Sequence, residues 1–307
     1  MELRVDEVSQ LRNSKISKLP NNLVSEFSHS QWSGKTDGTP WMQRALISMY
    51  RLLPLWVLYG CMSLVVPFYM IFNRQGYCST YRFFRQRLGY GKVRSFLHVY
   101  ANHFRFGQVI LDRFAVYAGK RFHFEVEGRE HFDRLAALPG GFIMLSSHVG
   151  CYEMAGYTLS SEVKRFNVLV YAGESATIMQ QRSALLGRHN MRMVPVSSDM
   201  SHLFALHGAL SAGEIVSMPA DRLFGSSKSV RCTFMGATAP FPVGAYRLSR
   251  ADDAPMLAVF VMKEGYRRYH LYVRPVATAQ DYADALSDMV RRYPNQWFNY
   301  YDFFCEC

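Results

Sequence analysis

The 307-residue chain contains only six cysteines, one long uncharged apolar run and no internal repeat. So few cysteines in a chain of this length do not form the dense disulfide framework of a small secreted domain, which favours a reduced, cytoplasmic setting. A single apolar run excludes a polytopic membrane protein. The chain also lacks a G-x-S-x-G motif, which excludes the nucleophile elbow of a serine hydrolase.

Acidic residues are missing altogether between Asp37 and Asp112. The same stretch holds nine basic residues, so most of the formal net charge of +11 is concentrated there: Arg44, Arg51, Arg74, Arg82, Arg85, Arg87, Lys92, Arg94 and Arg105. Such a segment attracts an anionic partner. No nucleic-acid-binding motif is visible, and a long apolar run has no role in binding nucleic acid, so lipid headgroups are the favoured partner.

The apolar run extends from Leu52 to Phe72 and contains 21 uncharged residues. This length matches the ~20 apolar residues that cross a hydrocarbon core. Pro54 and Pro67 argue against one straight helix, so a segment that lies in the membrane interface remains an alternative, as does a buried helix of a soluble protein. If the segment spans, the heavier basic flank that follows it places the C-terminal part in the cytoplasm.

Hydrophobic residues make up 49% of the chain, enough for a sizeable core, and helical and strand patterns alternate after residue 78. We expect an α/β sandwich with a mostly parallel central sheet flanked by helices. The expected helices are 78–118, 176–187, 199–212, 243–249 and 279–293. The expected strands are 122–128, 142–148, 166–171, 191–196, 214–220, 230–234, 256–262 and 269–275.

The most informative local pattern is SSHVGCYE, in which an apolar strand ends just before His148 and Glu153 follows five positions later. Open α/β sheets place their sites at the carboxyl ends of strands. On one continuous helix the two side chains would not share a face, but a loop bent at Gly150 lets them meet. A carboxylate beside an imidazole supports general-base chemistry. The alternative is a histidine that stabilises a loop and a glutamate that favours a helix start.

These residues carry a resemblance. His148-x4-Glu153 resembles the H-x4-D/E signature of the lysophospholipid acyltransferase superfamily, and within it the bacterial lipid A biosynthesis acyltransferases. Further blocks are similar in the same order, and together they cover roughly residues 41 to 304: Phe106–Phe114, Val216–Gly225, Phe234–Arg250 and Gln296–Phe304. Cys151-Tyr152 stands where that family more usually has Asn-Trp, which leaves the acceptor open.

The resemblance implies roles for six residues. His148 would act as general base on an acceptor hydroxyl or amine, with Glu153 orienting and charging the pair. Arg222 would stabilise an oxyanion or bind a phosphate, and Asp221 would orient Arg222. Pro242 and Gly244 would place backbone near the donor thioester. Without the resemblance, Asp221-Arg222 is a solvated pair at a strand end and Pro242–Gly244 an ordinary turn.

The sequence therefore predicts an acyltransferase that moves a fatty acyl chain from acyl carrier protein or acyl-CoA to a lipid-like acceptor, with no metal or organic cofactor. We expect a polar lead over residues 1–40, a membrane-anchoring segment over 41–75 and a catalytic domain over 76–307, which faces the cytoplasm at a bacterial inner membrane. The alternative is a non-catalytic, membrane-associated lipid-binding protein on the same fold. The acceptor, the donor and the acyl chain length are left open.

Overall fold

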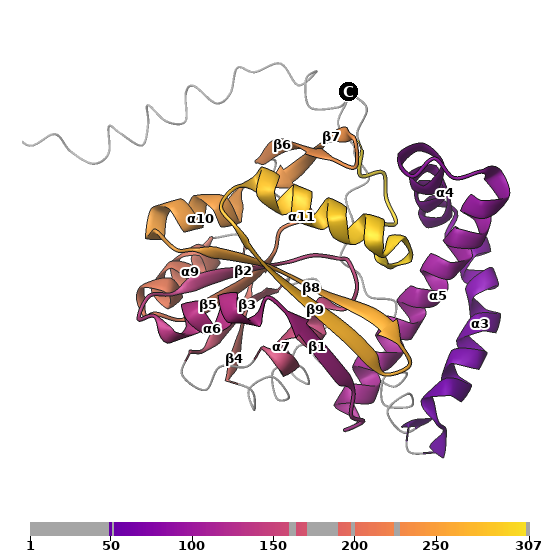
Figure 1. Ribbon diagram of the computed structural model, residues 1–307, viewed down its shortest axis with the longest axis horizontal. Coiled ribbons are helices and arrows are strands. Elements are labelled where there is room, and N and C mark those ends of the chain that lie inside the picture. Colours follow the sequence, from indigo (N-terminus) through magenta and orange to yellow (C-terminus); the bar gives the residue numbers. More distant parts are fainter. Residues whose placement is uncertain are drawn as a thin grey trace, which may run out of the picture. The chain divides into compact units, whose positions relative to one another are not determined.

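The computed structural model describes residues 49–50, 52–159, 164–170, 190–197, 200–223 and 228–304. A seven-stranded sheet with the order β1-β9-β8-β2-β5-β3-β4 lies at the centre (Figure 1). Its strands are β1 (His123–Glu127), β2 (Phe142–Ser146), β3 (Phe166–Val170), β4 (Met191–Pro195), β5 (Ile215–Pro219), β8 (Met256–Gly265) and β9 (Arg268–Val276).

All neighbouring strands of this sheet are parallel except β8 and β9, which form a hairpin. The prediction of a mostly parallel sheet is confirmed. Since parallel strands end at the same edge, the residues that follow β2 and β5 come close together there. The register pairs Ser146 with Pro219 at the ends of these two strands, and this pairing positions the site described below.

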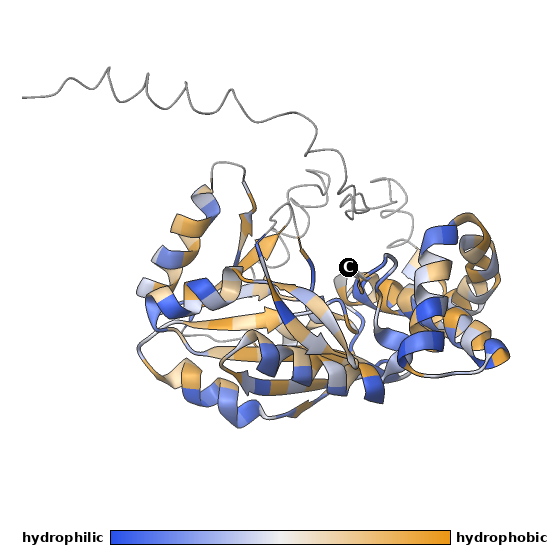
Figure 2. Ribbon diagram, turned by 90° about the horizontal axis from the view of Figure 1, so that it is seen from above, coloured by the Kyte–Doolittle hydropathy of each residue, from blue (hydrophilic) through white to orange (hydrophobic). Residues whose placement is uncertain are grey.

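Helices cover both faces of the sheet, and the central strands are buried on both sides, as expected for parallel strands. Ile143 and Leu145 of β2 pack with α9 (Ser201–Ser211), α10 (Gly244–Asp252) and α11 (Ala279–Arg292). Phe142 and Met144 pack on the opposite side with α6 (Arg129–Ala137). Apolar segments accordingly line the centre of the sheet in Figure 2.

The N-terminal helices form a group beside the sheet (Figure 1). They are α3 (Leu55–Phe72), α4 (Arg74–Arg82), a π-helical turn (Phe83–Arg87) and α5 (Lys92–Tyr117). The helical region predicted for 78–118 is interrupted, because the left-handed backbone of Gly89 ends the first part before α5 begins. α3 continues through Pro67, and Pro54 precedes it at the N-cap, where its missing N–H has no helical partner to lose.

Strand β7 (Ala237–Pro242) was not predicted from the sequence. Strand β6 (Ser229–Phe234) was predicted, and it pairs with β7 in a separate two-stranded hairpin. Pro240 and Pro242 argue against a strand because they donate no ladder hydrogen bond, yet a two-stranded hairpin tolerates proline at its edge. Most other elements lie within a few residues of their predicted limits. The predicted helix 176–187 falls outside the described residues.

Candidate active site

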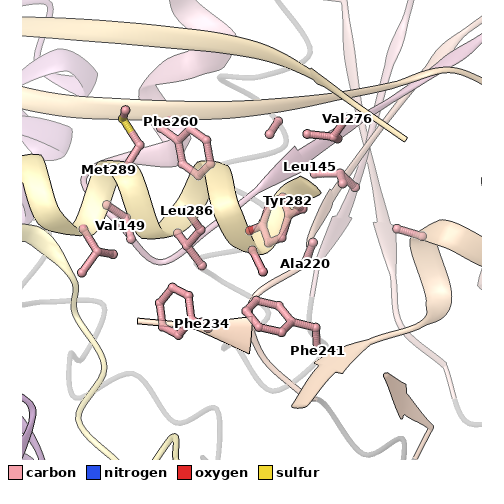
Figure 3. Packing of buried hydrophobic residues seen from close by; sticks show 14 of the residues in the cluster. Leu145, Val149, Ala220, Phe234, Phe241, Phe260, Val276, Tyr282, Leu286 and Met289 are labelled. Atoms are coloured by element: carbon pink, nitrogen blue, oxygen red, sulfur yellow. The ribbon is translucent and has the colours of Figure 1, made fainter. Parts of the chain in front are cut away.

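The candidate site lies at the carboxyl ends of β2 and β5. His148 follows β2 by two residues, and Asp221 follows β5 by two residues. Their chain neighbours Val149 and Ala220 are both buried in the core beneath α11 (Figure 3). The core therefore fixes the backbone on each side of the site and leaves the two polar side chains at the edge of the sheet.

Asp221 binds His148 at two points. Its Oδ1 lies 2.8 Å from the ring Nδ1, and its Oδ2 accepts the backbone N–H of His148 at 2.7 Å. The Asp221 side chain is almost fully buried, with 2% of its surface exposed, whereas 16% of the His148 side chain is exposed. A buried carboxylate on Nδ1 selects the tautomer in which Nδ1 carries the proton and Nε2 is the basic ring nitrogen.

The loop that carries His148 is held by backbone hydrogen bonds on two sides. The N–H of Cys151 donates to Val261 of β8, and the N–H of Gly150 donates to Gln296, while the carbonyl of His148 accepts from Phe298. Gly150 has φ of +65°, and a side-chain carbon there would lie 2.0 Å from the Val261 carbonyl oxygen. Only glycine fits this position, so the bend predicted at Gly150 is confirmed.

The electrostatic surroundings keep His148 neutral. Burial lowers its pKa, and the charge of Arg222 lowers it further, while Asp221 and Glu153 oppose the shift. The pKa of Asp221 is also lowered: burial disfavours its carboxylate, but the attraction and hydrogen bonds of His148 and the charge of Arg222 outweigh that effect. The pair therefore consists of a neutral imidazole and an ionised carboxylate near neutral pH, which suits a general base.

Glu153 lies in a short 3₁₀ turn, Tyr152–Met154, directly after the loop. Its Oε1 accepts a hydrogen bond of 2.7 Å from Nη1 of Arg113 on α5, and both side chains are largely buried. Sequence reasoning singled out Glu153 but missed Arg113, which lies at the end of the FGQVILDRF block. The charge of Glu153 favours the protonated form of His148. The role of Glu153 in a His-x4-Glu dyad remains a prediction.

Arg222 is buried near the pair, and its Nη2 donates to the Phe298 carbonyl at 2.5 Å. Asp221 was expected to orient Arg222. Its carboxylate binds the ring and the backbone N–H of His148, and its role in orienting Arg222 remains a prediction. Pro242 ends β7 and Gly244 begins α10. Gly244 is exposed, and among the described residues Met218 lies near the position of a side chain there. Its predicted place near the donor thioester remains a prediction.

Cys151 follows Gly150 in the motif, but its thiol is a weak nucleophile. The residue is buried, and burial together with the charge of Glu153 raises the pKa of its thiol to about 12. A thiol that stays protonated at neutral pH is a poor nucleophile.

Within the described residues, one group has metal-ligating side chains close together. Oxygen and nitrogen atoms of Glu125, Glu264 and His270 lie within 4.8 Å of one another on strands β1, β8 and β9. Arg268 lies 3.9 Å from Glu125 and 4.0 Å from Glu264, so a cation is already present as a side chain. The arrangement is that of a surface ion-pair cluster, and none of its members belongs to the His148 site.

Fold and site together define an α/β protein with a histidine–carboxylate pair at the carboxyl edge of a mostly parallel sheet. Residues 114–298, more than half of the chain, match the family model described as bacterial lipid A biosynthesis acyltransferase. The chain therefore belongs to the bacterial lipid A biosynthesis acyltransferase family, as its sequence motifs predicted. Among curated proteins, none matches the chain. Because the chain belongs to this family, the protein is an acyltransferase that acts on a lipid-like acceptor.

Proposed function

We propose that the protein transfers a fatty acyl chain from the thioester of acyl carrier protein or acyl-CoA to a hydroxyl or amine of a lipid-like acceptor, with His148 as general base. The observation that carries this proposal is the contact of Asp221 with both the ring and the backbone N–H of His148. A base held at two points is oriented before substrate arrives, and such orientation is a large part of acid–base catalysis.

In the proposed reaction, Nε2 of His148 takes the proton of the acceptor hydroxyl or amine as the heteroatom attacks the thioester carbonyl. A tetrahedral intermediate forms and collapses, the carbon–sulfur bond breaks, and the imidazolium returns the proton to the leaving thiolate. Atoms and charge balance without an acyl-enzyme. The thioester supplies the activated acyl group, so the proposal requires neither a metal nor an organic cofactor.

Three charged side chains have proposed parts in this cycle. Asp221 fixes the ring and stabilises the imidazolium that forms during proton transfer. Glu153 adds a second negative charge that favours the same imidazolium, and Arg113 holds Glu153 in place. Arg222, which lies within electrostatic reach of His148, would stabilise the oxyanion or bind a phosphate of either substrate.

The proposal also includes location and donor placement. The family is membrane-associated, and the helix α3 is long and apolar enough for a membrane, so we place the enzyme on the cytoplasmic face of a bacterial inner membrane. Pro242 and Gly244 would border the donor thioester, because a strand end followed by a helix start exposes backbone N–H groups there.

The test is a transfer assay with the full-length purified protein, acyl carrier protein or CoA thioesters and a panel of lipid acceptors. We expect His148→Ala to remove transfer while circular dichroism and thermal unfolding stay unchanged. The matched control is His207→Ala, because His207 also pairs with an aspartate, Asp252, but lies exposed on α9. Full activity of folded His148→Ala would contradict the role of His148 as general base, and absence of transfer by the folded unaltered protein would favour a non-catalytic lipid-binding protein.

A further inference from the structure

Within the described part of the chain, the apolar helix α3 packs one side against the protein. The buried positions recur at helical spacing: Leu55, Leu58, Tyr59, Val66 and Met70. Large apolar side chains on its other sides are exposed: Trp56, Leu64, Val65, Phe68, Ile71 and Phe72. A contiguous exposed group of this kind is rare on a soluble protein and marks an interaction surface.

α3 lies alongside α5 through its middle and C-terminal parts. Gly107 of α5 approaches Met62 so closely that a side-chain carbon at 107 would lie 2.7 Å from the sulfur. The Tyr100 hydroxyl donates to the Ser63 carbonyl at 3.0 Å. Nearer the end of α3, the rings of Tyr69 and His103 are 5.7 Å apart. α5 in turn lies between α3 and the sheet (Figure 1).

A buried polar cluster fixes the first half of α3 to the sheet. The Tyr59 hydroxyl donates to Asp112 of α5, and Lys263 of β8 binds the same carboxylate and lies 3.1 Å from the Tyr59 oxygen. Tyr269 of β9 donates to Asp112 at 2.6 Å. Both charged residues are fully buried. Because a buried ion pair that loses one partner is costly, α3 cannot leave this position without disrupting the core.

These contacts are incompatible with a helix that crosses the bilayer. α3 is about 27 Å long, so it would occupy nearly the whole hydrocarbon core if it spanned. α5 and the edge of the sheet would then enter the hydrocarbon with it, including Asn102, His103, Arg105 and Arg113. Charged side chains and sheet edges are not tolerated there. We propose that α3 instead lies in the plane of an anionic membrane surface and inserts its exposed apolar face into one leaflet.

The segment that follows α3 in the sequence has a composition that suits such a surface. Val93, Phe96 and Leu97 in the first turns of α5 are exposed apolar residues, and the exposed Lys92 and Arg94 flank Val93. Arg74 follows the end of α3 by two residues and is also exposed. Apolar side chains beside Lys and Arg, with no acidic residue from 38 to 111, are the composition of an interfacial anchor that prefers anionic lipid.

This mode of docking brings the candidate site close to the membrane. α5 separates α3 from the site, and packed helices lie about 8–10 Å apart. Arg113 of α5 binds Glu153, and Asn102 donates to the Trp297 carbonyl, next to the residue that binds the His148 carbonyl. One helix, α5, therefore links the docked helix α3 to the elements that hold the His148 loop.

The first test measures binding of the full-length protein to vesicles. We expect it to float with vesicles of phosphatidylethanolamine and phosphatidylglycerol, and less with phosphatidylcholine alone. Leu64→Glu combined with Phe68→Glu should weaken binding about tenfold or more, because two large apolar side chains no longer enter the lipid. Phe204→Glu is the matched control, since Phe204 is 79% exposed but lies on α9. Equal binding of all three proteins would overturn the docking surface.

The second test distinguishes a helix α3 that lies in the membrane surface from one that crosses the bilayer. One reporter tryptophan at a time, at position 56, 64 or 72, is compared for quenching by lipids brominated at different depths. Trp32 and Trp41 are replaced by Phe in every variant, Trp56 is replaced by Phe when the reporter is at 64 or 72, and the buried Trp297 is retained throughout. We expect similar, shallow depths at all three positions. Position 64 at the bilayer centre, with 56 and 72 near opposite surfaces, would overturn the proposal. His148→Ala should bind vesicles like the unaltered protein, so failure of the proposed catalysis would leave this result unaffected.

Discussion

Asp221 binds both the imidazole Nδ1 and the backbone N–H of His148, although 73 positions separate the two residues. One carboxylate thus fixes the ring and the loop that carries it. The two residues meet because β2 and β5 are parallel neighbours whose ends are in register. The fold therefore places a negative charge where an imidazolium would form, which is the arrangement that proton abstraction requires.

Asp221→Asn is expected to lower the rate of acyl transfer by about 10²- to 10⁴-fold, because an amide neither selects the required tautomer reliably nor stabilises the imidazolium. The rate is measured with saturating donor and acceptor. Asp252→Asn, which alters the other histidine–aspartate pair on α9 and α10, is the control and should retain activity. Normal turnover by Asp221→Asn would remove this carboxylate from the mechanism.

The pH dependence of transfer should show an acid limb below the usual histidine value of 6.5, because burial and Arg222 lower the pKa of His148. Activity should rise with pH as the imidazole loses its proton and should level off by neutral pH. Arg222→Gln removes a positive charge that disfavours the imidazolium, so the limb should move to higher pH. Glu153→Gln removes an opposing charge and should move it lower. The reverse shifts in kcat/KM would contradict the electrostatic assignment.

The ion pair between Arg113 and Glu153 should stabilise the fold as well as the site. Arg113→Ala leaves a largely buried carboxylate without this partner, and we expect a loss of about 1–3 kcal/mol in the free energy of unfolding. The measurement is urea unfolding of the solubilised protein. Adding Glu153→Gln to Arg113→Ala should restore part of the lost free energy of unfolding, because the negative charge that Arg113 neutralised is removed. If the double variant is as unstable as the two losses summed, the residues do not interact.

The Lys263–Asp112 pair is more deeply buried, and its loss should be more severe. Lys263→Met leaves Asp112 charged in the core, and we expect a destabilisation of about 3–5 kcal/mol, measured by the same unfolding assay. Lys263→Met combined with Asp112→Leu should be less destabilised than the single variant. Arg129→Met is a control, because the pair of Arg129 with Asp133 is exposed and should contribute little. Equal stability of Lys263→Met and Arg129→Met would contradict the structural role of the buried pair of Lys263 and Asp112.

Much of the fold could be predicted from the sequence, because buried strands and amphipathic helices have distinct periodicities. FIMLS at 142–146 is continuously apolar, and β2 is indeed buried on both faces. Helix 279–293 was predicted almost to the residue, and the structure shows a capping box of Thr278 and Asp281 at its start. β7 was missed because the pattern APFP contains two prolines, which mark turns more often than strands.

The site could be predicted only in part. His148 and Gly150 belong to a local motif, and a short segment contains enough information to recognise such a loop. The contacts of His148 with Asp221 and of Glu153 with Arg113 depend on strand order and on the docking of α5, which no local spacing encodes. His148 and Asp221 each follow a parallel strand by two positions, which indicates a shared site. This signal could be used only once β2 and β5 were known to be neighbours.

Lipid mass spectrometry of the native host, carrying the unaltered protein, His148→Ala or the control His207→Ala, tests the catalytic role of His148 most directly. We expect one lipid to lose a single acyl chain in His148→Ala alone, and the mass difference would identify the acceptor and the chain length. An unchanged lipid composition, with the His148→Ala protein present at its normal level, would contradict a catalytic role for His148.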